Sequence, residues 1–158
     1  MKNSFVPKNA IVPKGINTEM YNVRMLTVND LIKDYDAVMS STNHLKGVFG
    51  PNDDWPTGLT IEENLIDLGW HQKEFQKKSS FAFTVMSLDE TECLGCMYIY
   101  PSDNPSYDAI IIMWVRQSEV PNGLDEILFS IVKKWIQEKW PFNKVAYPGR
   151  DVSWDEFE

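Results

Sequence analysis

An aspartate pair followed by tryptophan is the part of the sequence whose residue types best suit recognition of a small charged ligand. Asp53, Asp54 and Trp55 lie in the segment GVFGPNDDWPTG, residues 47–58, whose glycine, proline, asparagine and aspartate content predicts a loop. Carboxylates attract cations, and an aromatic face stabilises an ammonium group that lies against it. We therefore expect these three residues to bind a cationic amine. The alternative is a turn whose tryptophan only closes the hydrophobic core.

Cys93 and Cys96 form a C-x-x-C pattern. A structural zinc site needs two such pairs, or a pair of histidines at zinc-finger spacing, and the sequence offers neither. A redox C-x-x-C usually opens a helix, whereas this one runs into the strand-like MYIY. We therefore expect no metal site. Because residues three apart in a strand point to opposite faces, both cysteines are predicted to be reduced, unlinked parts of the core.

His71 and Glu74 lie one helical turn apart and could share a metal ion or assist acid–base chemistry. The sequence around them supplies no third ligand. A helix face in contact with solvent is therefore the favoured interpretation of this pair.

The composition restricts the classes of protein that are possible. The chain has 158 residues, 43% hydrophobic and 13% aromatic, which suits one globular domain. Its formal net charge of −8 repels phosphate backbones and makes nucleic acid an unfavourable partner. No apolar run could span a bilayer, and Met1 to Pro13 contains lysines but no apolar signal segment. With two free thiols, these features predict a cytoplasmic protein without a membrane partner.

The candidate residues must be positioned by elements that the hydrophobic pattern predicts. Strands are expected at residues 21–26, 81–85, 93–100, 109–115 and 144–147. Helices are expected from Thr27 to about Ser40, after the Thr60–Glu63 capping box, and from Leu124 to the residue before Pro141. Each helix has an apolar stripe with helical spacing. These stripes are Leu31, Tyr35, Val38 and Met39 in the first helix, Ile61, Leu65, Leu68 and Phe75 in the second, and Leu124, Ile127, Leu128, Ile131, Val132 and Trp135 in the third.

The resulting order is β-α-α-β-β-β-α-β, which predicts an α/β (α+β) fold. Short turns join the middle strands, so these are expected to be antiparallel, and the last β-α-β unit is expected to form one parallel crossover. Residues 21–147 would form the domain. Residues 1–20 are expected to be an irregular arm, and residues 148–158 an irregular acidic tail.

This order, with its particular residues, resembles the GNAT superfamily of acyl-CoA-dependent N-acyltransferases. The resemblance runs from about Tyr21 to Tyr147 and rests on VRMLTVND, on the hairpin FAFTVMSLDETECLGCMYIY with Gly95, and on AIIIMWV followed by LDEILFSIVKKWI. It implies a mixed, mostly antiparallel sheet flanked by helices. It also implies that the fourth and fifth family strands, here Ile111 to Val115 and Lys144 to Tyr147, splay apart.

The resemblance implies that acetyl-CoA, or another acyl-CoA, binds as cosubstrate in this opening, with its diphosphate at the start of the helix at Leu124. The residues expected to contact it are Ile111, Ile112, Met113, Trp114, Val115, Arg116, Gly123 and Leu124. Arg116 is the expected phosphate partner. The resemblance also makes His44 the candidate catalytic base, because that region borders the acceptor site in the family.

Two features depart from the family pattern. The loop before the third helix, RQSEVPNGLDE, has one glycine, and Glu119, Asp125 and Glu126 place negative charge near the expected diphosphate. The alternative role of Asp125 and Glu126 is to stabilise the helix start. Few residues follow the last strand, so none matches the family's usual tyrosine acid. The arm, the tail or a second subunit in a homodimer would have to cover the open sheet edge.

Two functions follow. The first is an enzyme that transfers an acyl group, expected to be acetyl, from acyl-CoA to a small-molecule amine. The alternative is a non-catalytic GNAT-like binding or interaction module, favoured by the divergent loop and the short C-terminus.

Overall fold

The computed structural model describes residues 4–158, so the first three residues of the expected N-terminal arm lie outside it. A six-stranded sheet forms its centre, with the strands in sequence order. The strands are β1 (Gly15–Asn17), β2 (Tyr21–Met25), β3 (Phe81–Ser87), β4 (Cys93–Pro101), β5 (Ala109–Val115) and β6 (Val145–Ala146). All neighbours are antiparallel except β5 and β6. The mixed, mostly antiparallel α/β fold predicted from the sequence is therefore confirmed.

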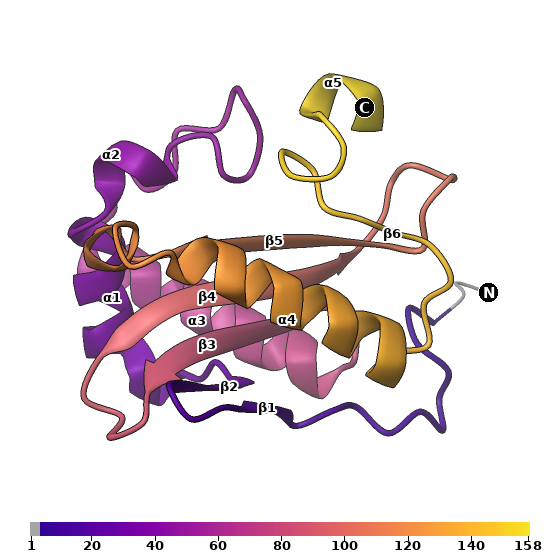
Figure 1. Ribbon diagram of the computed structural model, residues 1–158, viewed down its shortest axis with the longest axis horizontal. Coiled ribbons are helices and arrows are strands. Elements are labelled where there is room, and N and C mark those ends of the chain that lie inside the picture. Colours follow the sequence, from indigo (N-terminus) through magenta and orange to yellow (C-terminus); the bar gives the residue numbers. More distant parts are fainter. Residues whose placement is uncertain (1–3) are drawn as a thin grey trace.

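Helices cover both faces of this sheet (Figure 1). The helices are α1 (Leu31–Met39), α2 (Thr42–Leu45), α3 (Ile61–Gln76), α4 (Leu124–Lys139) and α5 (Trp154–Phe157), with short 3₁₀ turns at Val28–Asp30 and Gln117–Glu119. In the view of Figure 1, α4 crosses the front of the sheet, while α1 and α3 lie behind it. None of the helices in the described residues is long and apolar enough to cross a membrane.

The expected helix starts are present. Thr27 and Asp30 form a capping box before α1, and Thr60 and Glu63 form a second before α3. In each box the threonine hydroxyl accepts from a backbone amide, and the acidic side chain accepts from the threonine amide in return. These local bonds explain why both starts could be predicted from the sequence.

The inward face of α4 differs from the predicted stripe at one residue. Leu128 and Trp135 are buried and Ile131 is half-buried, as expected, but Ile127 is 39% exposed. The core-facing positions are Leu124, Leu128, Val132, Trp135 and Ile136. The buried face of α4 is therefore shifted slightly from the predicted apolar stripe, with Ile136 buried and Ile127 partly exposed.

The inward face of α3 differs more. Leu65 is exposed, while Asn64 and Leu68 are buried. The predicted stripe was therefore wrong at Leu65, since a polar residue takes the interior position one residue earlier. Asn64 can lie there because it donates to the buried carboxylate of Asp34, 2.9 Å away on α1.

A β-bulge changes the orientation of the two cysteines. Val85 pairs with Gly95, but the next residue of β3, Met86, pairs with Cys93, so Leu94 is an extra residue in β4. Cys93 and Cys96 consequently face the same side of the sheet, and the prediction that they point apart was wrong. Both are buried free thiols, and their Sγ atoms lie within 4.8 Å of each other and of a carboxylate oxygen of Asp34.

The arm and the tail have more structure than the sequence suggests. β1 pairs with β2 and covers that edge of the sheet, and Val6 is buried in the core on the α4 side. Gly15 permits this pairing, because a Cβ atom there would lie 1.9 Å from the carbonyl oxygen of Val23. In the tail, a bridge joins Pro148 to Val152 before α5.

Candidate functional site

The parallel strands β5 and β6 pair over only two residues each. Ala109 pairs with Val145 and Ile110 with Ala146, whereas β5 continues to Val115. Beyond Ile110 the edge of β5 is therefore not covered by β6. We call the space beside residues 111–115 of β5 the groove.

Alternation along β5 determines which backbone groups face the groove. The amide of Arg116 donates to Leu94 of β4, so the odd-numbered residues Ile111, Met113 and Val115 turn their backbone groups the other way. Two of their carbonyl oxygens accept from side chains. His44 Nε2 lies 2.8 Å from the oxygen of Val115, and Arg150 Nη2 lies 3.0 Å from the oxygen of Met113.

Two adjoining cavities of about 360 and 280 Å³ occupy the groove. His44, Met113, Asp125 and Arg150 line both. In Figure 1 this region lies above β5, between the α2 segment and the C-terminal segment that leads to α5. The sequence predictions for β5, His44 and the start of α4 thus fall in one place.

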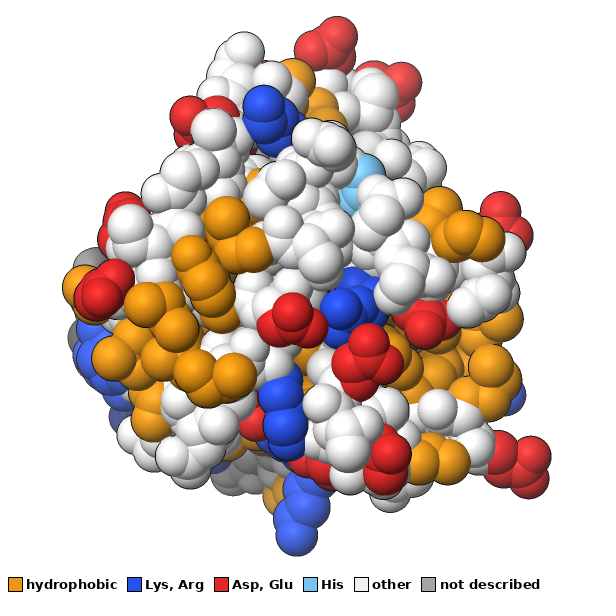
Figure 2. Space-filling view, turned by 90° about the vertical axis from the view of Figure 1, so that its left-hand side faces the viewer, with side chains coloured by type: hydrophobic (Ala, Val, Ile, Leu, Met, Phe, Trp, Pro, Cys, Tyr) orange, Lys and Arg blue, Asp and Glu red, His pale blue; other side chains and the backbone are white. Residues whose placement is uncertain are grey.

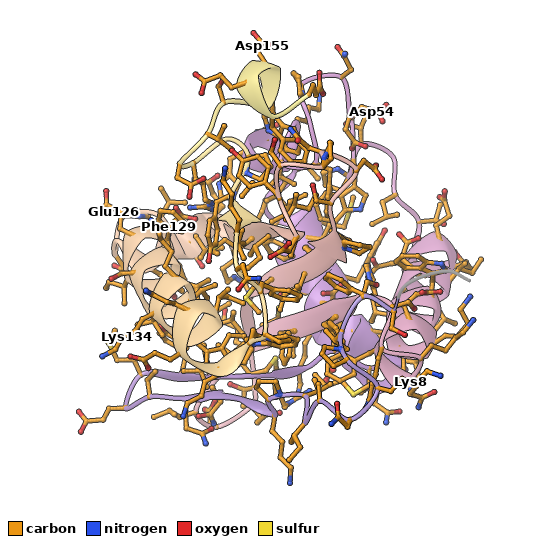
Figure 3. The ribbon with its side chains drawn as sticks, turned by 90° about the vertical axis from the view of Figure 1, so that its right-hand side faces the viewer. Lys8, Asp54, Glu126, Phe129, Lys134 and Asp155 are labelled. Atoms are coloured by element: carbon orange, nitrogen blue, oxygen red, sulfur yellow. The ribbon has the colours of Figure 1, made fainter. Side chains whose placement is uncertain are left out.

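The start of α4 holds an ion pair. Gly123, the residue before the helix, adopts φ 73°, and Asp125 in the first turn accepts two bonds from Arg150, at 2.7 and 2.8 Å. The guanidinium also lies over the ring of Phe129, 5.2 Å from its centre. Figure 3 shows Glu126 and Phe129 on this part of α4. The negative charge of Asp125 is therefore compensated within the chain.

Arg116 does not point into the groove. It is 8% exposed, donates to the carbonyl oxygen of Cys93 at 3.0 Å, and pairs with Asp36 and Glu92 at 3.2 Å each. These partners lie on the α1 side of the sheet and on the β3–β4 turn. The arginine beside the expected diphosphate position is Arg150, which no sequence motif indicated.

Acidic and basic side chains are interspersed on the end of the molecule with α2 and the start of α4 (Figure 2). Among the described residues on that face, no broad basic surface gathers. An anion on this face would be bound by Arg150 and by backbone amides at the start of α4, and not by a surface rich in lysines.

A third cavity, of about 180 Å³, lies on the α1 and α3 side of the sheet, beneath the loop 46–60. We call it the acidic pocket. Its lining residues come from α1, α3, β4 and this loop, and are Leu26, Asp34, Phe49, Asp53, Trp55, Asn64, Asp67, Leu68, His71 and Tyr98. Asp34 is 3% exposed and forms its floor, while the more exposed Asp53 and Asp67 lie at its rim.

Burial shifts the titration of the groups in this pocket. It raises the pKa of Asp34 to about 6, because only hydrogen bonds from Asn64 and the thiol of Cys96 oppose the loss of hydration. It also raises the pKa of the Cys96 thiol, which donates to Asp34 Oδ1 at 3.3 Å. Burial lowers the pKa of His71 to about 4, so its ring is neutral at pH 7.

The structure brings some predicted site residues together and separates others. Asp53 and Trp55 line the acidic pocket, whereas Asp54 is exposed and projects from the top of the molecule (Figure 3). His71 lies in the same pocket rather than on a solvated face. Glu74, which the sequence analysis considered together with His71, accepts a hydrogen bond from Ser79 instead. The favoured interpretation of the His71–Glu74 pair was therefore wrong.

The sequence analysis missed Asp34, Asn64, Asp67, Tyr98 and Arg150. One signal was available for the first two. Asp34 lies four residues before Val38, and Asn64 four before Leu68, so each places a polar side chain on a stripe that is otherwise apolar. Such an interruption indicates a paired buried group or a site.

No protein-family model matches the chain. No curated protein matches it either.

Solved structures do match. A ribosomal-protein-S5-alanine acetyltransferase from Vibrio fischeri is 15% identical, with a TM-score of 0.65 over 87% of this chain and 75% of that protein. RimL, a ribosomal L7/L12 alpha-N-protein acetyltransferase in complex with coenzyme A, is 15% identical, with a TM-score of 0.60 over 77% and 67%. The microcin C7 self-immunity acetyltransferase MccE, in complex with acetyl-CoA and AMP, is 17% identical, with a TM-score of 0.58 over 82% and 68%. The chain therefore has the fold of the GNAT acetyltransferases.

Proposed function

We propose that this protein is an acyl-CoA-dependent N-acyltransferase that transfers an acyl group, expected to be acetyl, to a small amine. The observation that carries the proposal is the uncovered edge of β5. It borders two cavities beside the first turn of α4, in a fold shared with proteins bound to coenzyme A and acetyl-CoA.

The groove fits an extended amide-containing chain along β5. The backbone groups of Ile111, Met113 and Val115 face it and can pair with amides, as in the addition of a strand to a sheet edge. The carbonyl oxygens of Met113 and Val115 already accept from Arg150 and His44, and each keeps a second lone pair for a ligand. At its far end, backbone amides of the first turn of α4 favour an anion. A bound diphosphate would replace Asp125 as the partner of Arg150.

His44 has the geometry for the proton transfer that amine attack requires. A carbonyl oxygen only accepts, so His44 Nε2 must carry the hydrogen that it shares with Val115. In the neutral ring, Nδ1 is then left as an acceptor. The neutral amine nitrogen would attack the thioester carbonyl and its proton would pass to Nδ1. The carbon–sulfur bond would then break and release coenzyme A as its thiolate.

One observation favours the second function, a non-catalytic module. Arg150 already bonds to Met113 on the groove edge and neutralises Asp125 at the helix start. Because the polar groups of the groove are already hydrogen-bonded to one another, the groove can serve to hold the C-terminal segment in place instead of binding a ligand.

A calorimetric titration with acetyl-CoA separates the two functions. We expect saturable binding that coenzyme A competes with, and formation of an acylated amine detected by mass spectrometry. Val120 lines the groove and is 45% exposed, so Val120→Trp should fill the groove without disturbing the core and weaken binding at least about tenfold. Leu88, 51% exposed on the β3–β4 turn, provides the matched control Leu88→Trp. Absence of binding at millimolar acetyl-CoA would leave the non-catalytic module.

A further inference from the structure

The acidic pocket is separated from the groove by packed aromatic side chains. Trp114 of β5 lines the groove, and its indole nitrogen donates to the hydroxyl of Tyr98, which lines the acidic pocket, at 2.9 Å. Trp55 lies against Trp114 with a ring separation of 6.2 Å. The pocket is therefore a second compartment with its own chemistry.

Its charge is not compensated by the residues that line it. Three carboxylates, those of Asp34, Asp53 and Asp67, line the pocket, and no lysine or arginine is among the described lining residues. Both side-chain partners of Asp34 are neutral donors, the amide of Asn64 and the thiol of Cys96. An ionised carboxylate at 3% exposure with only neutral partners is costly, and a cation beside it would remove that cost.

An unused nitrogen lies in the same pocket. His71 Nδ1 is shielded from solvent and has no hydrogen-bond partner among the described residues. The neutral imidazole can offer this atom as an acceptor. An ammonium group has three hydrogens to donate and no acceptor, which matches a site with carboxylates and an imidazole nitrogen but no cationic donor.

The walls of the pocket suit the apolar part of a ligand. Phe49 packs against both Trp55 and Tyr98, with ring separations of 5.1 and 5.2 Å, and His71 packs against Tyr98 at 5.2 Å. Aromatic faces stabilise cations and also exclude water from the carboxylate at the floor. The aromatic walls therefore suit a cation that carries an apolar group.

The volume limits the ligand to a small molecule. A cavity of about 150 Å³ is enough to hold benzene, so 180 Å³ accommodates about eight non-hydrogen atoms. The loop 46–60 contributes Phe49, Asp53 and Trp55 to the lining.

From this combination of charge, unused acceptor, aromatic walls and volume, we infer that the acidic pocket binds a small primary ammonium ion with a compact apolar body, its charge beside Asp34. The inference concerns a cation-binding site that is separate from the groove, and it stands without the proposed function.

Calorimetry with benzylamine and benzyl alcohol tests the inference in the absence of any acyl-CoA. The two probes have the same size and shape, but only benzylamine is an ammonium at neutral pH. We expect benzylamine to bind at least about tenfold more tightly, since hydrogen bonds between charged groups exceed neutral ones by that much. Asp34→Asn should remove this preference. Asp103→Asn makes the same charge change on the exposed β4–β5 turn and should leave it intact.

Equal binding of the two probes, or no binding of benzylamine at millimolar concentration, would overturn the inference. Tighter binding of a short peptide amine than of benzylamine would also overturn it. If Asp34→Asn does not fold, Asp67→Asn at the exposed rim should still weaken benzylamine selectively. Benzylamine binding without acetyl-CoA binding would retain this pocket and refute the acyltransferase.

Discussion

The groove and the acidic pocket, which Trp114 and Tyr98 separate, differ in how their acidic side chains are paired. In the groove, Asp125 is paired with Arg150, and the pair is anchored to the backbone of Met113. In the acidic pocket, Asp34 is more deeply buried than Asp125, yet its partners carry no charge. A carboxylate that is paired with an arginine, such as Asp125, gains little from a bound cation. A buried carboxylate with only neutral partners, such as Asp34, gains more, so that a bound cation would stabilise the folded protein. In the acidic pocket, a bound cation would therefore remove a cost that the chain itself leaves, whereas an anion in the groove would have to compete with Asp125 for Arg150.

The largest effect is expected from removing the wall between the two regions. Trp114 is 2% exposed and donates to the hydroxyl of Tyr98. Trp114→Ala should lower the free energy of unfolding by about 3–5 kcal/mol, because a large buried aromatic group is lost. Urea denaturation measures this, with Trp70→Ala as control, since Trp70 is 45% exposed. Similar losses in both variants would show that Trp114 is not a supporting wall.

Replacing Asp34 by a neutral residue should change the free energy of unfolding by less than Trp114→Ala does, and should raise it rather than lower it. The pKa of Asp34 rises from its ordinary 3.8 to about 6 in the folded protein, which corresponds to about 3 kcal/mol. Stability from this group is fully present below pH 3.8 and is lost as the pH rises through about 6. Asp34→Asn should therefore stabilise the protein by up to about 3 kcal/mol at neutral pH, and the two proteins should converge near pH 4.

Comparing the pH dependence of unfolding of the wild type and Asp34→Asn isolates the contribution of Asp34 and its direct partners from that of the rest of the protein. His71 acts in the other direction, because its lowered pKa removes stability as the pH falls from 6.5 towards 4. The other groups that face Asp34 are Asp30 and Asp67, the thiol of Cys96 and the amide of Asn64. Their interactions with Asp34 are part of the measured difference, whereas groups that do not face Asp34 cancel. A variant that is less stable than the wild type at neutral pH would show that Asp34 is already compensated.

These two regions also differ in how far the sequence predicted them. Both capping boxes, and β5 with its boundaries at Ala109 and Val115, followed from local patterns, because caps and apolar runs depend on neighbours in the chain. The position of the groove followed from the resemblance to the GNAT superfamily, which implied that the strands at Ile111 to Val115 and Lys144 to Tyr147 splay apart. The identity of its arginine did not, because Arg150 reaches Asp125 across 25 residues of sequence.

The acidic pocket was only partly predictable. Asp53 and Trp55 stood out as a loop motif, but its floor depends on Asp34 meeting Asn64 from another helix, 30 residues away. The count of apolar residues favoured Leu65 as the buried side chain of that helix. Likewise, the extra residue at Leu94 arises from pairing between strands, and alternation within one strand could not predict that Cys93 and Cys96 share a face.

Breaking the ion pair between Arg150 and Asp125 in the groove should change the free energy of unfolding by less than the substitutions of Trp114 and Asp34 do. Asp125 is 41% exposed, so its charge can be hydrated when Arg150 is removed. Arg150→Ala should lower the free energy of unfolding by about 1–2 kcal/mol, mainly through the lost charged hydrogen bonds. Arg150→Lys should recover part of the charge but not the two-bond geometry. A loss that does not change with salt concentration would contradict an electrostatic role for this pair.

The smallest change in stability is expected at His44, and that makes it the best test of whether the groove is catalytic. Its side chain is exposed apart from the bond to Val115, and a glutamine amide can donate the same bond. His44→Gln should therefore change the free energy of unfolding by no more than about 0.5 kcal/mol. Glutamine cannot accept a proton, so acyl transfer to an amine should fall about 10²–10⁴-fold while acetyl-CoA binding is retained. Thr42→Ser, on the same short helix, serves as the control for changes in that segment. If His44→Gln transfers the acyl group as fast as the wild type, water rather than His44 accepts the amine proton. The role of His44 would then be to donate a hydrogen bond to the backbone at the edge of β5.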